Sequence, residues 1–186
     1  MPPKTRITKD DIVKSATDIV RERGIGEINA RDIAARLNCS TQPIFSNFNN
    51  MNDLFEAVIR NAYDMYRTCI KHEMKKGEFP PYKASGMAYI EFARREKELF
   101  KLLFMCDRKG FPLDENSEEI VEMNRLVQKN VNLSVDEAAL FHLEMWIFVH
   151  GIATMLATGY LEFDRELISR MLSDSYLGIK KRYEEK

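Results

Sequence analysis

Side chains suited to reading the edges of DNA bases gather in one short segment, TQPIFSN, over residues 41–47. Gln42 can form two hydrogen bonds with adenine, and apolar groups such as Pro43 or Phe45 can contact the methyl group of thymine. Ile44 and Phe48 stand four residues apart, so on a helix they share one face. With that face packed inward, the side chains left to face outward are Thr41, Gln42, Phe45, Ser46 and Asn47.

Capping signals place this segment in a set of three N-terminal helices. Thr8 and Asp11 have the spacing of a capping box that begins a helix, and Gly24 is suited to end it. Asn29 is expected to cap a second, short helix and Ser40 a third. Two short helices joined by a tight turn and braced by a longer helix before them form a helix-turn-helix, whose second helix enters the major groove.

Contacts with the DNA backbone are predicted from helix starts and from nearby cations. Free N–H groups at a helix start attract phosphate, and lysine and arginine add ionic contacts. Residues 1–50 carry 8 basic and 6 acidic side chains, whereas the rest of the chain carries 20 and 23, so the N-terminal part is the positive one. The residues predicted to contact the backbone are Asn29, Ser40, Asn50, Lys4, Arg6 and Arg31.

Helical periodicity continues to the end of the chain, without strand-period alternation of useful length and without an internal repeat. Ser134 and Glu137 predict a second capping box, and Gly159 the end of that helix. We expect an all-α protein of about nine helices. After the first three, the predicted helices cover approximately residues 51–76, 82–105, 117–130, 134–158 and 164–181, with a loop over 107–116. Whether residues 82–105 form one helix or two is left open by the sequence.

Composition excludes several classes of protein. With 186 residues and 45% hydrophobic side chains the chain can build a core, and a net charge of −1 excludes the coating of nucleic acid by bulk charge. The separated Cys39, Cys69 and Cys106 exclude a disulfide scaffold and a cysteine-rich zinc site. No apolar run follows the charged N-terminus, and the apolar stretch 146–157 is too short to span a membrane. We therefore expect a cytoplasmic protein.

Motifs that support catalysis are missing from the sequence. There is no GxSxG, no HExxH, no Walker loop and no dinucleotide fingerprint. His142 and His150 are eight residues apart on one predicted helix, too far for a simple pair of metal ligands at i and i+4. The sequence therefore predicts a protein that is not an enzyme and that uses neither a metal nor a cofactor.

The N-terminal segments ITKDDIVKSATDIVRERG, INARDIAARLNCS, TQPIFSNF and NDLFEAV resemble, in order and spacing, the DNA-binding domain of the TetR family of transcriptional regulators. The family usually has Tyr at the position of Phe45 and Lys at the position of Met51, and both commonly contact phosphate. Phe45 lacks the hydroxyl and Met51 lacks the charge. We expect weaker non-specific binding, or compensation by Lys4, Arg6 and Arg31.

Two later segments extend the resemblance. AYIEFARREKELFKLLF is similar to the stretch that joins the fifth and sixth helices in many members, although the family often has Pro where this chain has Lys97. MWIFVHGIATMLATG resembles the WHG-type C-terminal domain, named after the residues found here as Trp146, His150 and Gly151. The resemblance implies a DNA-binding domain over residues 1–50, a connecting helix over 51–76, and a ligand-binding and dimerisation domain over 77–186.

The resemblance implies a homodimeric regulator that acts as a repressor, binds a palindromic operator and is released from it by a small molecule. The aromatic and methionine-rich helices favour an apolar or aromatic effector. The predicted effector contacts are Tyr89, Phe92, Phe104, Met105, His142, Met145, Trp146 and His150. The predicted dimer contacts are Gly151, Met155, Leu167, Met171, Leu172 and Tyr176.

The alternative is a helical interaction protein of the same fold that has lost DNA binding, since Phe45 and Met51 both lack a phosphate-binding group. For the predicted effector contacts, the competing interpretation is ordinary packing in a hydrophobic core. The sequence does not distinguish a repressor from an activator.

Overall fold

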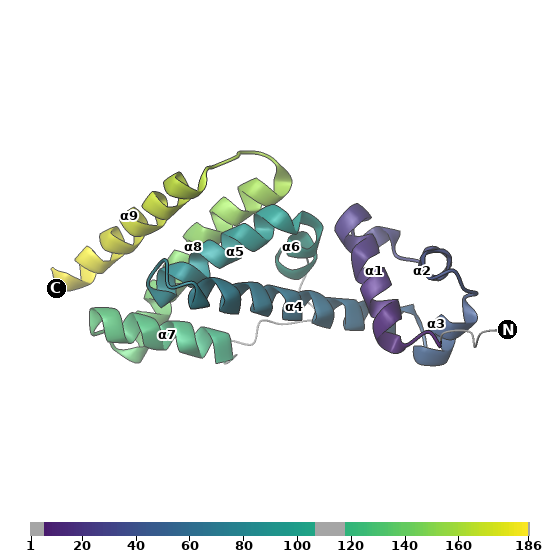
Figure 1. Ribbon diagram of the computed structural model, residues 1–186. Coiled ribbons are helices and arrows are strands. Elements are labelled where there is room, and N and C mark those ends of the chain that lie inside the picture. Colours follow the sequence, from purple (N-terminus) through teal and green to yellow (C-terminus); the bar gives the residue numbers. More distant parts are fainter. Residues whose placement is uncertain (1–5, 107–117, 186) are drawn as a thin grey trace. The chain divides into compact units, whose positions relative to one another are not determined.

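Only helices occur in the part of the chain that the computed structural model describes, residues 6–106 and 118–185 (Figure 1). The predicted all-α fold is therefore confirmed. In chain order, the elements are α1 (Lys9–Arg23), the 3₁₀ helix η1 (Ile25–Glu27), α2 (Ala30–Arg36), α3 (Gln42–Asn47), α4 (Met51–Lys75), α5 (Pro81–Arg95), α6 (Lys97–Phe104), α7 (Glu118–Val131), α8 (Val135–Thr158) and α9 (Arg165–Glu184).

The helices group into two compact units. The first unit consists of Met1–Arg67 and Glu96–Cys106, so it contains α1, α2, α3, α6 and most of α4. The second unit consists of Thr68–Arg95 and Asp107–Lys186 and contains the end of α4 with α5, α7, α8 and α9. These units describe packing, whereas the predicted division at residues 50 and 76 concerns function and stays a prediction.

Helix α1 begins and ends where the sequence predicts. The Thr8 hydroxyl accepts a hydrogen bond from the Asp11 N–H (3.1 Å), and the Asp11 carboxylate accepts one from the Thr8 N–H (2.9 Å), which completes the capping box. Gly24 follows the helix with φ 88°, a conformation that costs glycine little. A side chain there would also meet the Glu98 carboxylate, 3.1 Å from the position of its Cβ.

The apolar face of α1 forms the centre of the first unit, with α2, α3 and α6 packed against it. Two polar contacts fix α1 to other helices of the unit. Asn61 of α4 donates from Nδ2 to the Thr17 hydroxyl at 3.0 Å, and the Arg21 guanidinium donates twice to Glu96, at 2.7 and 2.6 Å. The fully buried residues of this face are Ile12, Ala16, Ile19 and Val20.

The start of α3 differs from the prediction by one residue. Thr41, and not Ser40, is the N-cap, and no side chain caps the helix. The turn after α2 takes up the extra residue, because Asn38 adopts a positive φ of 51° and the Cys39 N–H returns to the Ala34 carbonyl at 2.9 Å. The carbonyl of Thr41 is then the first to accept helical hydrogen bonds.

The helical stretch predicted over residues 82–105, whose division into a fifth and a sixth helix the sequence leaves open, breaks at Glu96 into α5 and α6. Glu96 has φ −119° and ψ 54°, outside the helical region. Its carboxylate receives the two hydrogen bonds from Arg21, so a tertiary contact coincides with a break that the local sequence does not mark. The predicted loop over residues 107–116 lies outside the described residues.

Helices α5 and α8 form the centre of the second unit, and α7 and α9 pack against them. One core cluster joins buried residues of three helices: Tyr82, Val127, Ala138, Phe141 and Met145. The second capping box is confirmed, since the Ser134 hydroxyl accepts from the Glu137 N–H at 3.3 Å and α8 ends at Gly159 with φ 68°. Asp164 caps α9 by accepting a hydrogen bond from the Leu167 N–H at 2.7 Å.

Candidate functional site

Helix α3 exposes the side chains that the sequence selects for base contacts. Ile44 and Phe48 are buried, as predicted, and they anchor the helix to the first unit. Gln42 and Ser46 are exposed on the remaining surface, and Phe45 leaves 53% of its surface in solvent. Because an aromatic side chain normally gains stability by burial, this exposure indicates that Phe45 is not part of the core.

The other members of this predicted surface are held more firmly. Thr41, Pro43 and Asn47 are half-buried. The amide of Asn47 donates from Nδ2 to the Pro43 carbonyl at 2.7 Å, and the Ser46 hydroxyl donates to the same oxygen at 3.0 Å. Among the described residues, Gln42 has no such partner, so its amide keeps its full capacity to bind another molecule.

Two of the three predicted helix-start residues, Asn29 and Asn50, act as caps in the structure. Asn29 accepts from the Asp32 N–H at 2.9 Å, and Asn50 accepts from the Asp53 N–H at 3.0 Å. Their side chains are therefore engaged at the helix starts of α2 and α4. Ser40 is exposed one residue before the N-cap of α3, so it stands near a helix start without capping it.

The cations of the first unit fall into two groups. Arg23 and Arg36 are neutralised by acidic partners, Asp32 at 3.0 Å and Glu22 respectively. Arg6 and Arg31 are exposed, and neither has an ion-pair partner within residues 6–106 and 118–185. Lys4 lies outside the described residues. Lys9 has no distinguishing signal in the sequence, because only the packing of α1 on α3 brings its Nζ to 4.9 Å from the centre of the Phe48 ring.

Two tyrosine–histidine pairs connect α5 with α8 in the second unit. Tyr82 Oη lies 3.0 Å from His142 Nδ1, and Tyr89 Oη lies 2.9 Å from His150 Nδ1. The tyrosines are seven residues apart and the histidines eight, about two helical turns in each case. The two pairs are therefore successive polar contacts along one helix–helix interface.

Burial keeps the first of these pairs neutral. It lowers the pKa of His142 to about 4 and raises the pKa of Tyr82 above its ordinary value. At pH 7 both side chains are therefore uncharged, and their hydrogen bond satisfies polar atoms inside the unit. In the second pair His150 is also stacked on Trp146, with ring centres 5.0 Å apart and planes 16° apart.

The predicted effector contacts are divided between the two units. Phe92 and Met145 are buried in the second unit. Phe104 belongs to the first unit, where its ring meets Tyr66 edge-on at 5.2 Å, and Met105 of that unit is exposed. The assignment of these residues to an effector therefore stays a prediction.

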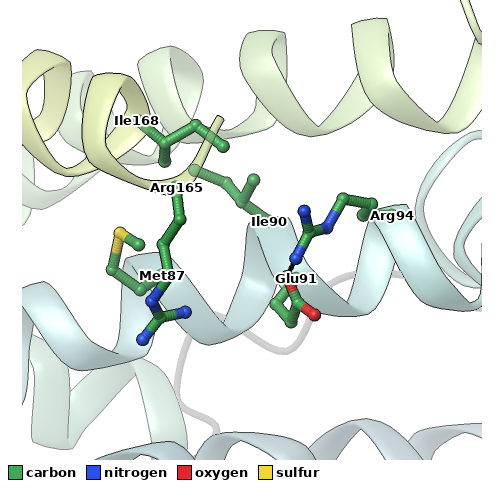
Figure 2. Close-up of a pocket in the computed structure, with 6 residues that line it drawn as sticks. All are labelled: Met87, Ile90, Glu91, Arg94, Arg165 and Ile168. Carbon is green, nitrogen blue, oxygen red and sulfur yellow. Dashed lines mark hydrogen bonds and ion pairs between the residues drawn. The ribbon is translucent and has the colours of Figure 1, made fainter. Parts of the chain in front are cut away.

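A small pocket of the second unit has a different lining (Figure 2). It lies between α5 and α9, and its free interior of about 10 Å³ suffices for about one water molecule. None of the predicted effector contacts lines it. The lining combines three apolar and three charged side chains: Met87, Ile90, Ile168, Glu91, Arg94 and Arg165.

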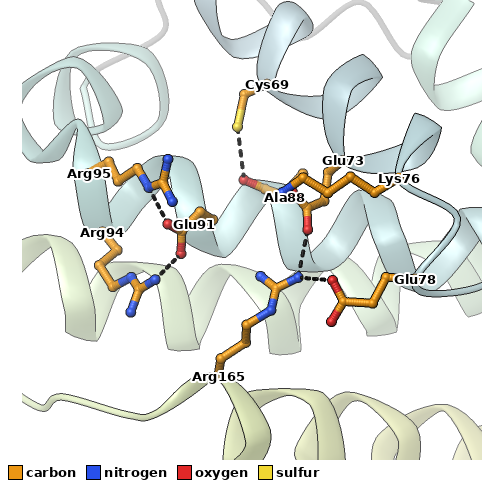
Figure 3. Close-up of polar contacts among 9 residues, drawn as sticks. All are labelled: Cys69, Glu73, Lys76, Glu78, Ala88, Glu91, Arg94, Arg95 and Arg165. Carbon is orange, nitrogen blue, oxygen red and sulfur yellow. Dashed lines mark hydrogen bonds and ion pairs between the residues drawn. The ribbon is translucent and has the colours of Figure 1, made fainter.

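The charged residues at this pocket are already paired (Figure 3). Arg165 of α9 donates to Glu73 and to Glu78, at 2.7 Å in both cases. Glu73 is buried, and although burial raises the pKa of its carboxyl, hydrogen bonds from Lys76 and Arg165 outweigh this effect and lower the pKa overall. Glu91 pairs with two neighbouring arginines of α5. These contacts fasten the end of α4 to the start of α9.

Helix α8 exposes five large apolar side chains on one broad face, which we call the α8 stripe. Glu144, four residues after Leu140 and four before Phe148, lies on the same face and pairs with Arg182 of α9. On α9, Leu177 is also exposed. The stripe consists of Leu140, Leu143, Ile147, Phe148 and Met155.

The predicted dimer contacts divide between this surface and the interior. Met155 belongs to the stripe, and a side chain at Gly151 would meet only open space. Leu172, by contrast, is 97% buried within its own unit, since 3% of its surface is exposed. Tyr176 is half-buried against Phe141, with ring centres 5.2 Å apart. The remaining two, Leu167 and Met171, are half-buried.

Part of the second unit matches a known protein family. Residues 82–175, about half of the sequence, match the model of the tetracyclin repressor-like C-terminal domain. The chain belongs to the TetR family of transcriptional regulators. The matched residues include the two tyrosine–histidine pairs, the α8 stripe and most of the second unit. The match confirms the family resemblance found in the sequence.

A solved structure supports the fold of this TetR family member over nearly its whole length. It is a TetR-like transcriptional regulator from Rhodococcus sp. RHA1, with a TM-score of 0.67 and 16% sequence identity. The alignment covers 95% of this chain and 96% of that chain, so the helix-turn-helix part is included. No curated protein sequence matches this chain significantly. As a TetR family regulator, the protein is a DNA-binding transcriptional regulator.

Two properties of the TetR family chain bear on its environment. Helix α8 is long and apolar enough to cross a membrane by length and composition alone, and 33% of its most apolar window is buried. Its exposed stripe accounts for much of this apolar character. Within the described residues, no cluster of histidine, cysteine, aspartate or glutamate is arranged to hold a metal ion.

Proposed function

We propose that the protein is a cytoplasmic, homodimeric repressor that binds a palindromic operator and releases it when a small apolar or aromatic effector binds. The observation that carries this proposal is the outer surface of α3, which combines the unengaged amide of Gln42 with the exposed ring of Phe45. Such a surface offers hydrogen bonds to adenine and an apolar contact to a thymine methyl group.

The backbone of the duplex would be held by the rest of the predicted surface. Arg6 and Arg31 offer unpaired charge, and the helix starts at Asn29 and Asn50 present backbone N–H groups next to their caps. Lys4, Ser40, Thr41, Pro43, Ser46 and Asn47 complete the predicted DNA contacts. These contacts position α3, while the base edges provide the sequence preference.

The α8 stripe supports the homodimer. An exposed apolar surface of this kind is typical of a protein–protein interface. In a symmetric homodimer the second copy presents the same apolar face to it. Leu177 of α9 extends the surface, so α8 and α9 of two copies can form a four-helix interface. Leu172 and Tyr176 would then pack within each copy, behind the residues that form the interface. The dimer would hold two α3 helices about 34–36 Å apart, one turn of DNA, or at a multiple of this spacing.

Release by an effector is supported by the aromatic core between α5 and α8. The predicted contacts Tyr89, Trp146 and His150 lie together there, joined by a hydrogen bond and by stacked rings. An effector that binds among them and favours a different spacing of the two α3 helices lowers operator affinity by its difference in affinity for the two states.

The alternative of the same fold without DNA binding has one observation in its favour. Neither Phe45 nor Met51 offers a group that binds phosphate. Fluorescence anisotropy of labelled duplexes with the purified chain, over a range of salt concentrations, separates the two functions. Binding that weakens steeply with salt supports a DNA reader, and no duplex binding even at low salt supports the alternative.

A further inference from the structure

The surface that would meet the duplex has no cation of its own. From Leu37 to Ile59, a segment that includes all of α3, the sequence contains no lysine or arginine and contains two acidic residues, Asp53 and Glu56. Double-stranded DNA carries about one negative charge per 1.7 Å of its axis. A cation from elsewhere in the first unit must therefore stand beside α3 if α3 is to approach the groove.

Four arginines of the surrounding helices are engaged in exposed ion pairs of the first unit, whereas Arg6 and Arg31 are not. In each pair the charge of the arginine is compensated within the protein, so binding a phosphate would first require breaking an existing contact. The pairs are Arg21–Glu96, Arg23–Asp32, Arg36–Glu22 and Arg60–Glu56.

Lys9 is placed differently. Its Nζ lies 4.9 Å from the centre of the Phe48 ring, the residue that directly follows α3. Phe48 is buried, so its ring is a fixed support, whereas Lys9 itself is exposed. An aromatic ring attracts a cation without neutralising it. Within the described part of the chain Lys9 has no acidic partner, so its full charge is held at the end of α3.

We propose that Lys9 is a phosphate-binding cation beside α3, in addition to Arg6 and Arg31, held in place by the ring of Phe48. The proposal rests on the proposed DNA-binding function and adds a cation at the end of α3 itself. The ammonium group would contact a phosphate oxygen of the duplex backbone, which carries no sequence information. Lys9 should therefore strengthen binding to every duplex to the same degree.

The test measures how the association constant depends on salt. Full-length protein is titrated against a labelled duplex of mixed sequence and against one enriched by selection, each over a series of salt concentrations. For K9Q we expect several-fold weaker binding to both duplexes. The slope of log K against log salt concentration should fall by about 0.9 for each copy of the chain bound. K9R should keep the wild-type slope.

The matched control is Lys14, a second lysine of α1 that is also exposed. K14Q removes the same charge from the same helix, and we expect the wild-type slope. F48L, which keeps an apolar side chain but removes the ring, should bind with a slope between those of the wild type and K9Q. An unchanged slope in K9Q, or an equal fall in K14Q, would overturn the assignment of Lys9. No duplex binding by the wild type would instead contradict the proposed function itself.

Discussion

Helices α3 and α8 both leave apolar side chains in solvent, but their surfaces differ in kind. On α3 a single aromatic residue, Phe45, stands beside the amide of Gln42 and the hydroxyl of Ser46. On α8 five exposed apolar residues share one broad face, on which Glu144 is the charged residue and is paired with Arg182. The first pattern suits a partner with mixed polarity, such as base edges in a groove. The second suits an apolar partner with a shape like its own.

The electrostatics of the two units differ in the same sense. In the first unit exposed ion pairs neutralise most arginines around the helix-turn-helix and leave a few cations unpaired. In the second unit the polar contacts between α5 and α8 are neutral, as in the pair Tyr82–His142, whereas charged pairs join α4 to α9. The affinity for DNA would therefore fall as the salt concentration rises. The stability of the core between α5 and α8 would instead depend on pH, because burial shifts the pKa of His142.

The largest expected effect comes from placing a charge in the α8 stripe. We expect Ile147→Asp to convert the dimer into a monomer, because each uncompensated charge buried at the interface costs about 3–5 kcal/mol. The measurement is the molar mass in solution by light scattering. Val135→Asp introduces the same charge at the exposed start of α8 and should leave the dimer intact. A dimeric I147D variant would show that the stripe is not the interface.

The pH dependence of stability tests the buried pair of the second unit. His142 has a folded pKa of about 4 against 6.5 when unfolded, so at falling pH the unfolded state takes up the proton first. The folded state is thus favoured above pH 6.5, and this contribution, up to about 3 kcal/mol, is lost as the pH falls towards 4.

In His142→Asn we expect this part of the pH dependence to vanish from urea unfolding curves. The asparagine oxygen can still accept a hydrogen bond from Tyr82, so the variant should fold. His72→Asn changes an exposed histidine and should keep the wild-type dependence. Parallel curves for H142N and the wild type would mean that His142 is not desolvated in the folded protein.

Gln42 sharpens the comparison from the side of α3. We expect Gln42→Ala to weaken operator binding by about 1–3 kcal/mol and to relax the preference for one base pair. Gln128→Ala removes the same group from α7 and serves as a control. The measurement is a binding-site selection with each variant. An unchanged base preference in Q42A would reject the role of Gln42.

The smallest effect is expected for Met51→Lys. A lysine at the first position of α4 adds one exposed charge, and such a contact contributes about 0.2–1 kcal/mol. All duplexes should therefore bind slightly more tightly and by the same factor, as measured by anisotropy. A gain confined to the operator would show that position 51 reads bases and does not contact the backbone.

Much of the fold follows from local signals in the sequence. The capping boxes at Thr8 and Ser134 and the glycines at 24 and 159 lie where the structure begins and ends α1 and α8. The inward face of α3 follows from the four-residue spacing of Ile44 and Phe48. These features depend on neighbours within one turn, and such signals can be recognised without knowing the tertiary structure.

Other features depend on contacts between distant segments, and the sequence did not reveal them. The break at Glu96 coincides with its hydrogen bonds to Arg21, 75 residues away. The placement of Lys9 over Phe48 depends on how α1 packs against α3. The α8 stripe could have been predicted from the strongly apolar composition of its helix. A helix with apolar residues around its circumference needs packing partners on all its faces. The buried position of Leu172 required the packing of α9.

The most direct test of the central claim is a selection of bound duplexes from a random pool by the purified wild-type protein at low salt. If a dimer presents two α3 helices to the major groove, the enriched sequences will contain an inverted repeat. Its half-sites will be centred about 10–10.5 base pairs apart, or a multiple of that distance. Enrichment of a single unrepeated site, or no enrichment at all, would contradict the claim.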